Sequence, residues 1–134
     1  MNPIVKTILA IIAGAFVGGL VNMGIIMLGS GISVPEGVDP MDVESIKANI
    51  DKYQYYHFIV PFLAHAIGTL VGAYLAVKVA GHKMVAALVV AALFLYGGIS
   101  MVMQLPSPMW FNVLDLVGAY IPMGLLGHKL ATKA

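Results

Sequence analysis

The chain has 134 residues, of which 60% are hydrophobic and 10% are charged, and its formal net charge is +1. Soluble domains are about 45–50% apolar and about 25% charged, so this composition excludes an ordinary soluble domain. The near-neutral charge and the lack of a basic cluster indicate that nucleic acid is not a partner. No cysteine occurs, which excludes disulfides, thiolate metal ligands and thiol redox chemistry.

Four apolar stretches are each long enough to cross the hydrocarbon core of a bilayer, which takes about 20 residues. They cover residues 7–28, 58–79, 84–105 and 110–126. We predict a single integral membrane domain over residues 1–134, with an all-α fold, a four-helix transmembrane bundle. The first stretch starts like a secretory signal, but its apolar run continues past any cleavage point, so we expect a retained helix.

The first connection, residues 29–56, is too long to be a plain turn. After turn-forming residues, Asp39 has the properties of a helix N-cap and Pro40 those of the first helical residue. Apolar residues then recur at near-helical spacing. We predict a short amphipathic helix over residues 40–53 outside the membrane, with its apolar stripe against lipid or the bundle.

Proline residues mark the other interruptions of the chain. Pro106 and Pro108 predict a tight turn between the third and fourth spans, because neither can continue a helix. Pro61 and Pro122 fall inside the second and fourth spans. Each removes a backbone donor there, so we expect a kink in both helices.

A short motif occurs twice in the chain. Leu-Val-Gly-Ala-Tyr at residues 70–74 precedes Gly-His-Lys at residues 81–83, and both segments recur with the same spacing at residues 116–120 and 127–129. Internal repetition of this kind indicates two duplicated helical hairpins, in which the second and fourth spans run in the same direction. Convergence of two apolar stretches is the alternative explanation.

Lysine residues predict the orientation, because the loops that flank spans on the cytoplasmic side are enriched in positive charge. Five lysines fall at the two termini and the second connection: Lys6, Lys78, Lys83, Lys129 and Lys133. Only Lys47 and Lys52 fall in the first connection. We therefore predict a multi-pass protein in the lipid bilayer with both termini in the cytoplasm.

Asp115 is the only acidic residue inside an apolar span. A charge at the bilayer centre costs about 2.5–3.5 kcal/mol on insertion scales, so such residues face the bundle interior and find a partner. His65 is the expected partner. The helical rise places it about 12 Å below the outer end of the second span, and Asp115 about 8 Å below that of the fourth. We expect a proton-sensitive pair.

Other polar side chains are expected at a similar depth. Asn112 precedes Asp115 by one helical turn on the same face. The repeat offset places Thr69 opposite Asp115. Asn22 in the first span and Gln104 in the third are expected at this depth too. The predicted outward-facing polar site therefore consists of Asp115, His65, Asn22, Asn112, Gln104 and Thr69. Asp115 would either share a proton with His65 or donate to Asn22, Gln104 or a carbonyl group.

This polar site supports several classes of function. The leading hypothesis is a non-enzymatic membrane protein that binds or passes a small solute or ion. The alternative is an accessory or scaffold subunit in which the same residues form a purely structural network. A metal-dependent membrane enzyme is least supported, because one histidine and one carboxylate fall short of a zinc ligand set. We expect no metal, no cofactor and no catalytic residue.

Small residues recur at four-residue spacing in the first two spans. They are Gly14 and Gly18 in the first span, and Ala64, Gly68, Gly72 and Ala76 in the second. Such stripes let helix backbones approach closely. We predict that they pack the first span against the second; contact with a second copy of the chain or with a partner membrane protein is the alternative.

Three segments of the chain carry a resemblance to known sequences. Residues 21–27, 57–65 and 115–122 resemble those of a group of small four-span bacterial inner-membrane proteins. The likeness covers nearly the whole chain. It implies a four-helix protein of the bacterial inner membrane, and it brings no activity, cofactor or site residue with it.

Overall fold

The computed structural model describes residues 1–133, which form helices and contain no strand. The long helices are α1 (Pro3–Leu28), α4 (Ile59–Val79) and α5 (Lys83–Gln104), and the last span consists of α6 (Met109–Gly118) and α7 (Ile121–Lys133). Four helical stretches are long and apolar enough to cross a bilayer. The predicted all-α bundle is therefore confirmed, and the chain has the architecture of a multi-pass membrane protein.

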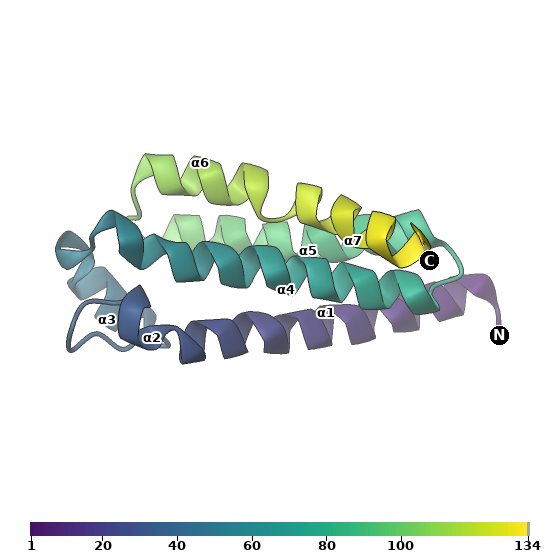
Figure 1. Ribbon diagram of the computed structural model, residues 1–134, viewed down its shortest axis with the longest axis horizontal. Helices are drawn as coiled ribbons and strands as arrows, with labels where there is room; N and C mark the ends of the chain where they lie inside the picture. The colour runs from purple at the N-terminus through teal and green to yellow at the C-terminus, as the bar shows by residue number, and fades with distance from the viewer. Residues whose placement is uncertain (134) are drawn as a thin grey trace.

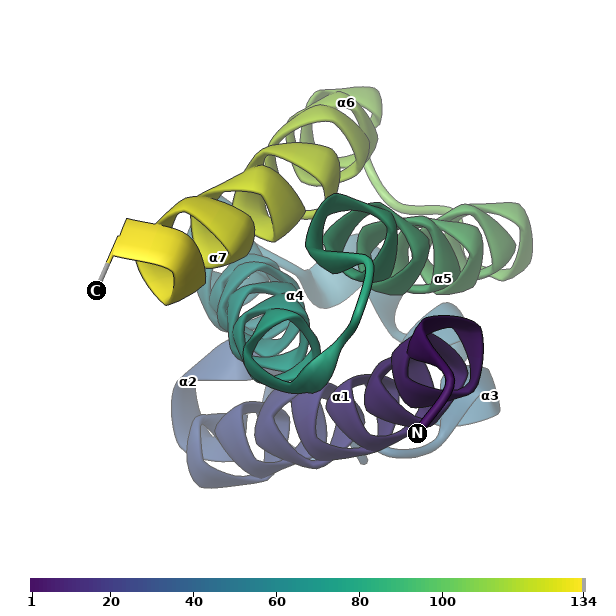
Figure 2. The same ribbon diagram turned by 90° about the vertical axis from the view of Figure 1, so that its right-hand side faces the viewer.

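The helices lie side by side along the long axis of the molecule (Figure 1). The short helices α2 (Ser30–Ser33) and α3 (Val43–Ala48) lie at one end, here termed the loop end, and both chain termini lie at the other. Viewed along the axis in Figure 2, α4 is central and contacts α1, α5 and α7. Helix α4 runs in the same direction as α6 and α7, as the repeat predicts.

The closest helix contact is between α1 and α4, where glycine faces glycine. A Cβ atom added at Gly18 would lie 2.6 Å from the carbonyl oxygen of Gly68, and one at Gly72 would lie 2.7 Å from that of Gly14. Side-chain carbons do not approach carbonyl oxygens this closely, so only glycine fits at these crossings. Two alanines of the same stripe are also buried: Ala64 and Ala76. The stripe thus lies inside the bundle.

The last span is broken where the sequence predicted a kink. Helix α6 ends at Gly118 and α7 begins at Ile121, with a bend over Ala119 and Tyr120. Pro122 offers no N–H to the Gly118 carbonyl, and its ring would clash with that carbonyl in a continuous helix. The break turns the Tyr120 side chain into the bundle, where it is 2% exposed.

The other proline expected to kink a helix, Pro61, has a different role. It is the third residue of α4, which follows directly on the 3₁₀ turn η2 (Tyr55–Phe58). Backbone N–H groups in the first turn of a helix have no partner within that helix. Pro61 therefore lies inside the span, as predicted, but the prediction that it removes an interior backbone donor is wrong.

The two copies of the repeated motif differ in local structure. Residues 70–74 lie within the continuous helix α4, whereas residues 116–120 include the break between α6 and α7. Pro122 accounts for this difference, because the equivalent residue of the first copy is Ala76. The shared sequence therefore predicts the shared direction of the two spans but not their local conformation.

The first connection folds back over the loop end of the bundle. Helix α2 follows α1 almost directly, and α3 is followed by the 3₁₀ turn η1 (Ile50–Lys52). The predicted amphipathic helix over residues 40–53 is too long, because Asp42 rather than Asp39 caps α3, accepting a hydrogen bond from the Glu44 N–H at 3.1 Å. Asp39 instead accepts from the Met41 N–H, at 2.9 Å, in the preceding turn.

Candidate functional site

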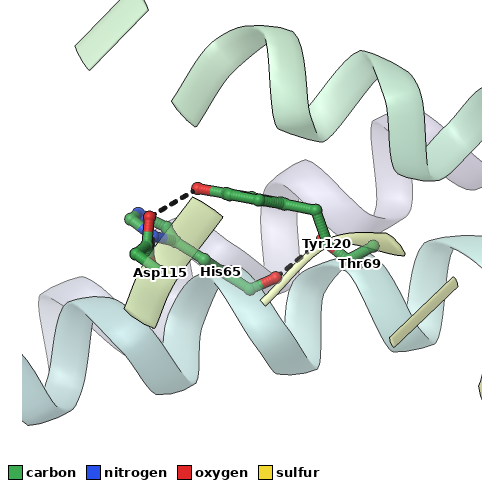
Figure 3. Close-up of polar contacts among 4 residues, drawn as sticks. All are labelled: His65, Thr69, Asp115 and Tyr120. Carbon is green, nitrogen blue, oxygen red and sulfur yellow. Dashed lines mark hydrogen bonds and ion pairs between the residues drawn. The ribbon is translucent and has the colours of Figure 1, made fainter. Parts of the chain in front are cut away.

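Asp115 is the centre of a buried polar chain that joins α4 to the broken last span (Figure 3). Its Oδ1 atom lies 2.7 Å from His65 Nδ1, and its Oδ2 atom accepts a hydrogen bond from the Tyr120 hydroxyl at 2.9 Å. The His65 ring also stacks on the Tyr120 ring, with centroids 5.8 Å apart. Asp115 is only 3% exposed, so its carboxyl group depends on these protein partners for hydrogen bonds.

Three local features hold this polar chain of side chains in place. The break before α7 allows Tyr120 to turn back toward Asp115, five residues earlier in the sequence. Gly98 of α5 leaves room for the tyrosine, because a Cβ atom there would lie 2.5 Å from the Tyr120 hydroxyl oxygen. One turn beyond His65, Thr69 donates its hydroxyl to the His65 carbonyl at 2.7 Å (Figure 3).

The polar chain defines the hydrogen-bonding role of His65. When the Asp115 carboxylate acts only as an acceptor, His65 Nδ1 carries the hydrogen that faces it. The other ring nitrogen, Nε2, then accepts when the ring is neutral and donates when it is protonated. Nε2 forms no hydrogen bond among residues 1–133. A carboxylate partner at one ring nitrogen fixes the orientation of the imidazole and leaves the other nitrogen available.

A cavity of about 120 Å³ lies next to this pair at the loop end of the bundle. We term it the loop-end cavity. Its walls are mostly apolar and include Ile26, Ile46, Ile50, Phe58, Met101 and Phe111. The same cavity is lined by His65, Asp115, Asn112 and Ser33. The apolar stripe of the first connection, represented by Ile46 and Ile50, therefore faces the bundle interior.

Two polar atoms at the loop-end cavity are unsatisfied. Ser33 Oγ and Asn112 Oδ1 are buried and have no hydrogen-bond partner in the part of the chain that the structure describes. Asn112 uses only its amide nitrogen, which donates to the Ser107 carbonyl at 3.3 Å. An unpaired buried polar group costs about 1–3 kcal/mol.

Tyr53 of the first connection also lines the loop-end cavity. It lies outside the membrane-spanning helices, and its ring packs against Phe58 with centroids 5.5 Å apart. Burial raises the pKa of the Tyr53 hydroxyl. The hydroxyl therefore remains protonated at neutral pH and can donate a hydrogen bond.

The predicted site residues do not all meet at one place. His65 and Asp115 are in direct contact, and Asn112 lines the same cavity. Gln104 lies apart from them: it is exposed, and its amide nitrogen donates to the Ser100 carbonyl at 3.2 Å and the Ser100 hydroxyl at 3.0 Å. The expected bond between Asp115 and Gln104 is wrong, because His65 and Tyr120 occupy the two carboxyl oxygens.

Asn22 and Thr69 lie near the polar chain without forming a hydrogen bond to Asp115. Asn22 lines a groove on the flank of the bundle, together with His65 and Tyr120. Its Oδ1 atom is buried and unpaired within residues 1–133. The hydroxyl of Thr69 is engaged inside α4, so this residue supports the helix that carries His65.

Tyr120 is the site residue that the sequence did not predict. A tyrosine within an apolar span is typical of ordinary helix packing, and here it also belongs to a repeated motif whose first copy, Tyr74, has a different environment. Tyr74 packs beneath Lys78, whose Nζ atom is 5.4 Å from the ring centroid. Pro122, two residues after Tyr120, was the one signal that the second copy differs.

The described residues contain no cluster of three or more His, Asp or Glu side chains that could hold a metal ion. No protein-family model matches this sequence, and no curated protein or solved structure is significantly similar to it. The interpretation of the site therefore depends on its own geometry.

Proposed function

We propose that the protein binds a small, largely apolar solute in the loop-end cavity, with the polar end of the solute at His65. The observation that supports this proposal is the polar chain of hydrogen bonds from Tyr120 through Asp115 to His65. It fixes the imidazole beside an apolar cavity and leaves the Nε2 atom of His65 unpaired. The protein has no enzymatic role in this proposal, because binding requires only the oriented imidazole and the apolar walls.

The size of the cavity limits the solute. An engineered protein cavity of about 150 Å³ accommodates benzene, so the smaller cavity of about 120 Å³ limits the solute to about one six-membered ring. His65 at the cavity lining favours a solute with one hydrogen-bonding group. Such a molecule would bury an apolar body against the walls and keep its polar group near His65.

Phenol is a suitable probe for this proposal, since it combines a benzene-sized ring with one hydroxyl group. In bilayer nanodiscs, we expect phenol to shift the His65 ¹⁵N resonances in a saturable manner. The expected dissociation constant is about 1 mM, a binding free energy of about 4 kcal/mol in magnitude. The variant Val102→Phe places a larger side chain at the cavity lining and should weaken binding at least tenfold. Val113→Phe, at a residue that is 54% exposed, is the matched control and should bind like the parent.

Two outcomes would contradict the proposal. One is a phenol-induced shift that grows linearly with concentration, as partition into the bilayer would produce. The other is equal phenol affinity in Val102→Phe and the parent. Assignment of the His65 resonances by comparison with His65→Gln distinguishes them from those of the other histidines.

A second candidate function is an accessory or scaffold subunit, and a specific observation favours it. Both carboxyl oxygens of Asp115 are already paired with His65 and Tyr120. The polar chain is therefore satisfied at Asp115 without any ligand, as a purely structural network would be. Under this function the unpaired atoms of the loop-end cavity would have no role in binding.

We also propose that the protein resides in the bacterial inner membrane with both termini in the cytoplasm. The lysines of the first connection lie at the loop end, and those near the termini and in the α4–α5 connection lie at the opposite end. The second group of lysines is larger. Because positive charge is enriched on the cytoplasmic side, the end of the bundle that carries the termini is assigned to the cytoplasm. The loop-end cavity would then face outward.

Single cysteines introduced at Asp42 and Lys133 test this orientation, since the chain has no cysteine of its own. A membrane-impermeant maleimide added to intact cells should label the cysteine at position 42 and leave the one at position 133 unlabelled until the cells are lysed. Labelling of position 133 alone in intact cells would reverse the assignment.

A further inference from the structure

His57 is a second buried histidine, separate from the polar chain around Asp115. It lies in the turn η2 at the loop end and is 6% exposed. Its Nδ1 atom accepts a hydrogen bond from the Gln54 backbone N–H at 2.8 Å, and its own backbone N–H donates to the Gln54 carbonyl oxygen at 3.0 Å. This reciprocal pair fastens the end of the first connection to the turn that leads into α4.

The bond from Gln54 defines the protonation state of His57. A backbone N–H can only donate, so Nδ1 carries no hydrogen, and the ring is neutral with its hydrogen on Nε2. Protonation of the ring would place a hydrogen on Nδ1 that points at the Gln54 N–H. Two donors cannot bond to each other, so the protonated ring has to leave Gln54.

No acidic partner compensates a charge on His57. The rings of Tyr53 and Tyr56 pack against it, with centroids 5.3 and 4.3 Å away, and both tyrosines stay neutral in acid. Turn η2 also contacts α2 and the first turn of α4, and neither contains a titratable side chain. Glu36 and Lys52 line the same surface groove as His57, but both are exposed, and neither forms an ion pair with it among residues 1–133.

The surroundings of His57 extend to the wall of the loop-end cavity. The Tyr53 ring packs against His57 on one side and against Phe58, at 5.5 Å between centroids, on the other. Tyr53 and Phe58 both line the cavity. Because Tyr53 directly precedes Gln54, a change at Gln54 acts on a residue of the cavity wall.

We propose that Gln54 and His57 form an acid-sensitive latch, closed over the loop-end cavity while the His57 ring is neutral and released when the ring takes up a proton. The effect of the latch on solute binding rests on the proposed function of that cavity. The opening of the latch itself does not depend on any solute.

The sign and size of the pH effect follow from the neutral ring. The latched form holds only the neutral ring, so it is favoured at neutral pH. Below the ordinary histidine pKa of about 6.5, each pH unit disfavours it by about tenfold relative to the released form. The equilibrium constant for latching should therefore fall about a hundredfold between pH 7.5 and pH 4.5.

Hydrogen exchange at the Gln54 amide measures this equilibrium directly, because that N–H is the group released. Gln54 lies outside the membrane-spanning helices, so water reaches the opened amide. In the full-length protein in nanodiscs, we expect the protection factor of Gln54, corrected for intrinsic exchange, to fall about a hundredfold from pH 7.5 to pH 4.5. The fall should follow the ¹⁵N titration of the His57 ring.

Two variants assign the effect to His57. His57→Asn places a carbonyl oxygen near the position of Nδ1 and does not titrate, so its Gln54 protection should be the same at both pH values. Glu36→Gln removes the carboxyl group of the same surface groove and should respond to pH like the parent. Melting curves like that of the parent show that both variants are folded.

Phenol binding tests the link to the loop-end cavity. Both the parent and His57→Asn contain His65, so protonation of that residue affects the two proteins alike. We expect the loss of phenol affinity from pH 7.5 to pH 4.5 to be at least twofold larger in the parent than in His57→Asn.

Equal Gln54 protection at both pH values in the parent would overturn the latch, and so would an equal fall in folded His57→Asn. If His57→Asn does not fold, a fall in Gln54 protection that departs from the His57 titration overturns the latch instead. A fall in protection with equal loss of phenol affinity in the two proteins would remove its control of the cavity. Absence of phenol binding at pH 7.5 would refute the proposed function, while Gln54 protection would still decide whether the latch exists.

Discussion

Gly72→Leu will destabilise the bundle by about 1–3 kcal/mol, the usual cost of forcing extra carbon atoms into a packed interface. A Cβ atom at this position would lie 2.7 Å from the Gly14 carbonyl oxygen and 3.3 Å from a methyl carbon of Val90. The first of these neighbours is backbone, so it cannot rotate away as a flexible side chain could. The rest of the leucine would push α1 away from α4 along the whole glycine contact.

Unfolding in mixed micelles of increasing dodecyl sulfate fraction, followed by circular dichroism, measures this change. Gly24→Leu is the matched control, because an added Cβ at Gly24 meets no atom of another element within 4 Å in the described residues. We expect the control to unfold like the parent. Equal stability of Gly72→Leu and Gly24→Leu would contradict the close packing of α1 and α4 and show that the glycine stripe tolerates bulk.

The number and direction of the spans could be predicted from the sequence because they follow from simple one-dimensional quantities. Apolar length identifies a span, and the repeat indicates that two spans are parallel. Small residues every four positions identify a helix face, since that spacing returns to the same side of a helix. The packing of Gly68 and Gly72 against the first span could therefore be predicted from the sequence.

The matching level of His65 and Asp115 along the bundle could also be predicted, but the rotation of each helix about its axis could not. The rise per residue places Gln104 and Asp115 at similar levels, yet Gln104 is exposed and bonds to Ser100 instead. The direction in which a side chain points depends on how its helix packs, and for Tyr120 it depends on a break in the backbone. Pro122 predicted a disturbance, but not that the helix would restart three residues after Gly118 and turn a tyrosine inward.

The second large effect concerns the tautomer of His65. With an ionised Asp115, His65 Nδ1 donates to Oδ1 and Tyr120 donates to Oδ2, at 2.7 and 2.9 Å. In Asp115→Asn, if the side-chain oxygen keeps accepting from Tyr120, the amide nitrogen donates to His65 Nδ1. The imidazole hydrogen then moves to Nε2. The nitrogen offered to a ligand changes from an acceptor to a donor, while the shape of the site is preserved.

We therefore expect Asp115→Asn to fold with a stability within about 1–2 kcal/mol of the parent, the range for exchanging one hydrogen-bonding group for another. Its affinity for phenol at the loop-end cavity should fall at least tenfold, because an acceptor for the phenol hydroxyl has been lost. The ¹⁵N shifts of His65 distinguish the two tautomers directly. Asp115→Leu should be less stable than Asp115→Asn, since it leaves the donors of both His65 and Tyr120 unpaired at about 1–3 kcal/mol each. If the tautomer changes in Asp115→Asn while phenol binding does not, His65 is not the group that receives the solute, and the polar chain has the structural role of the accessory-subunit alternative.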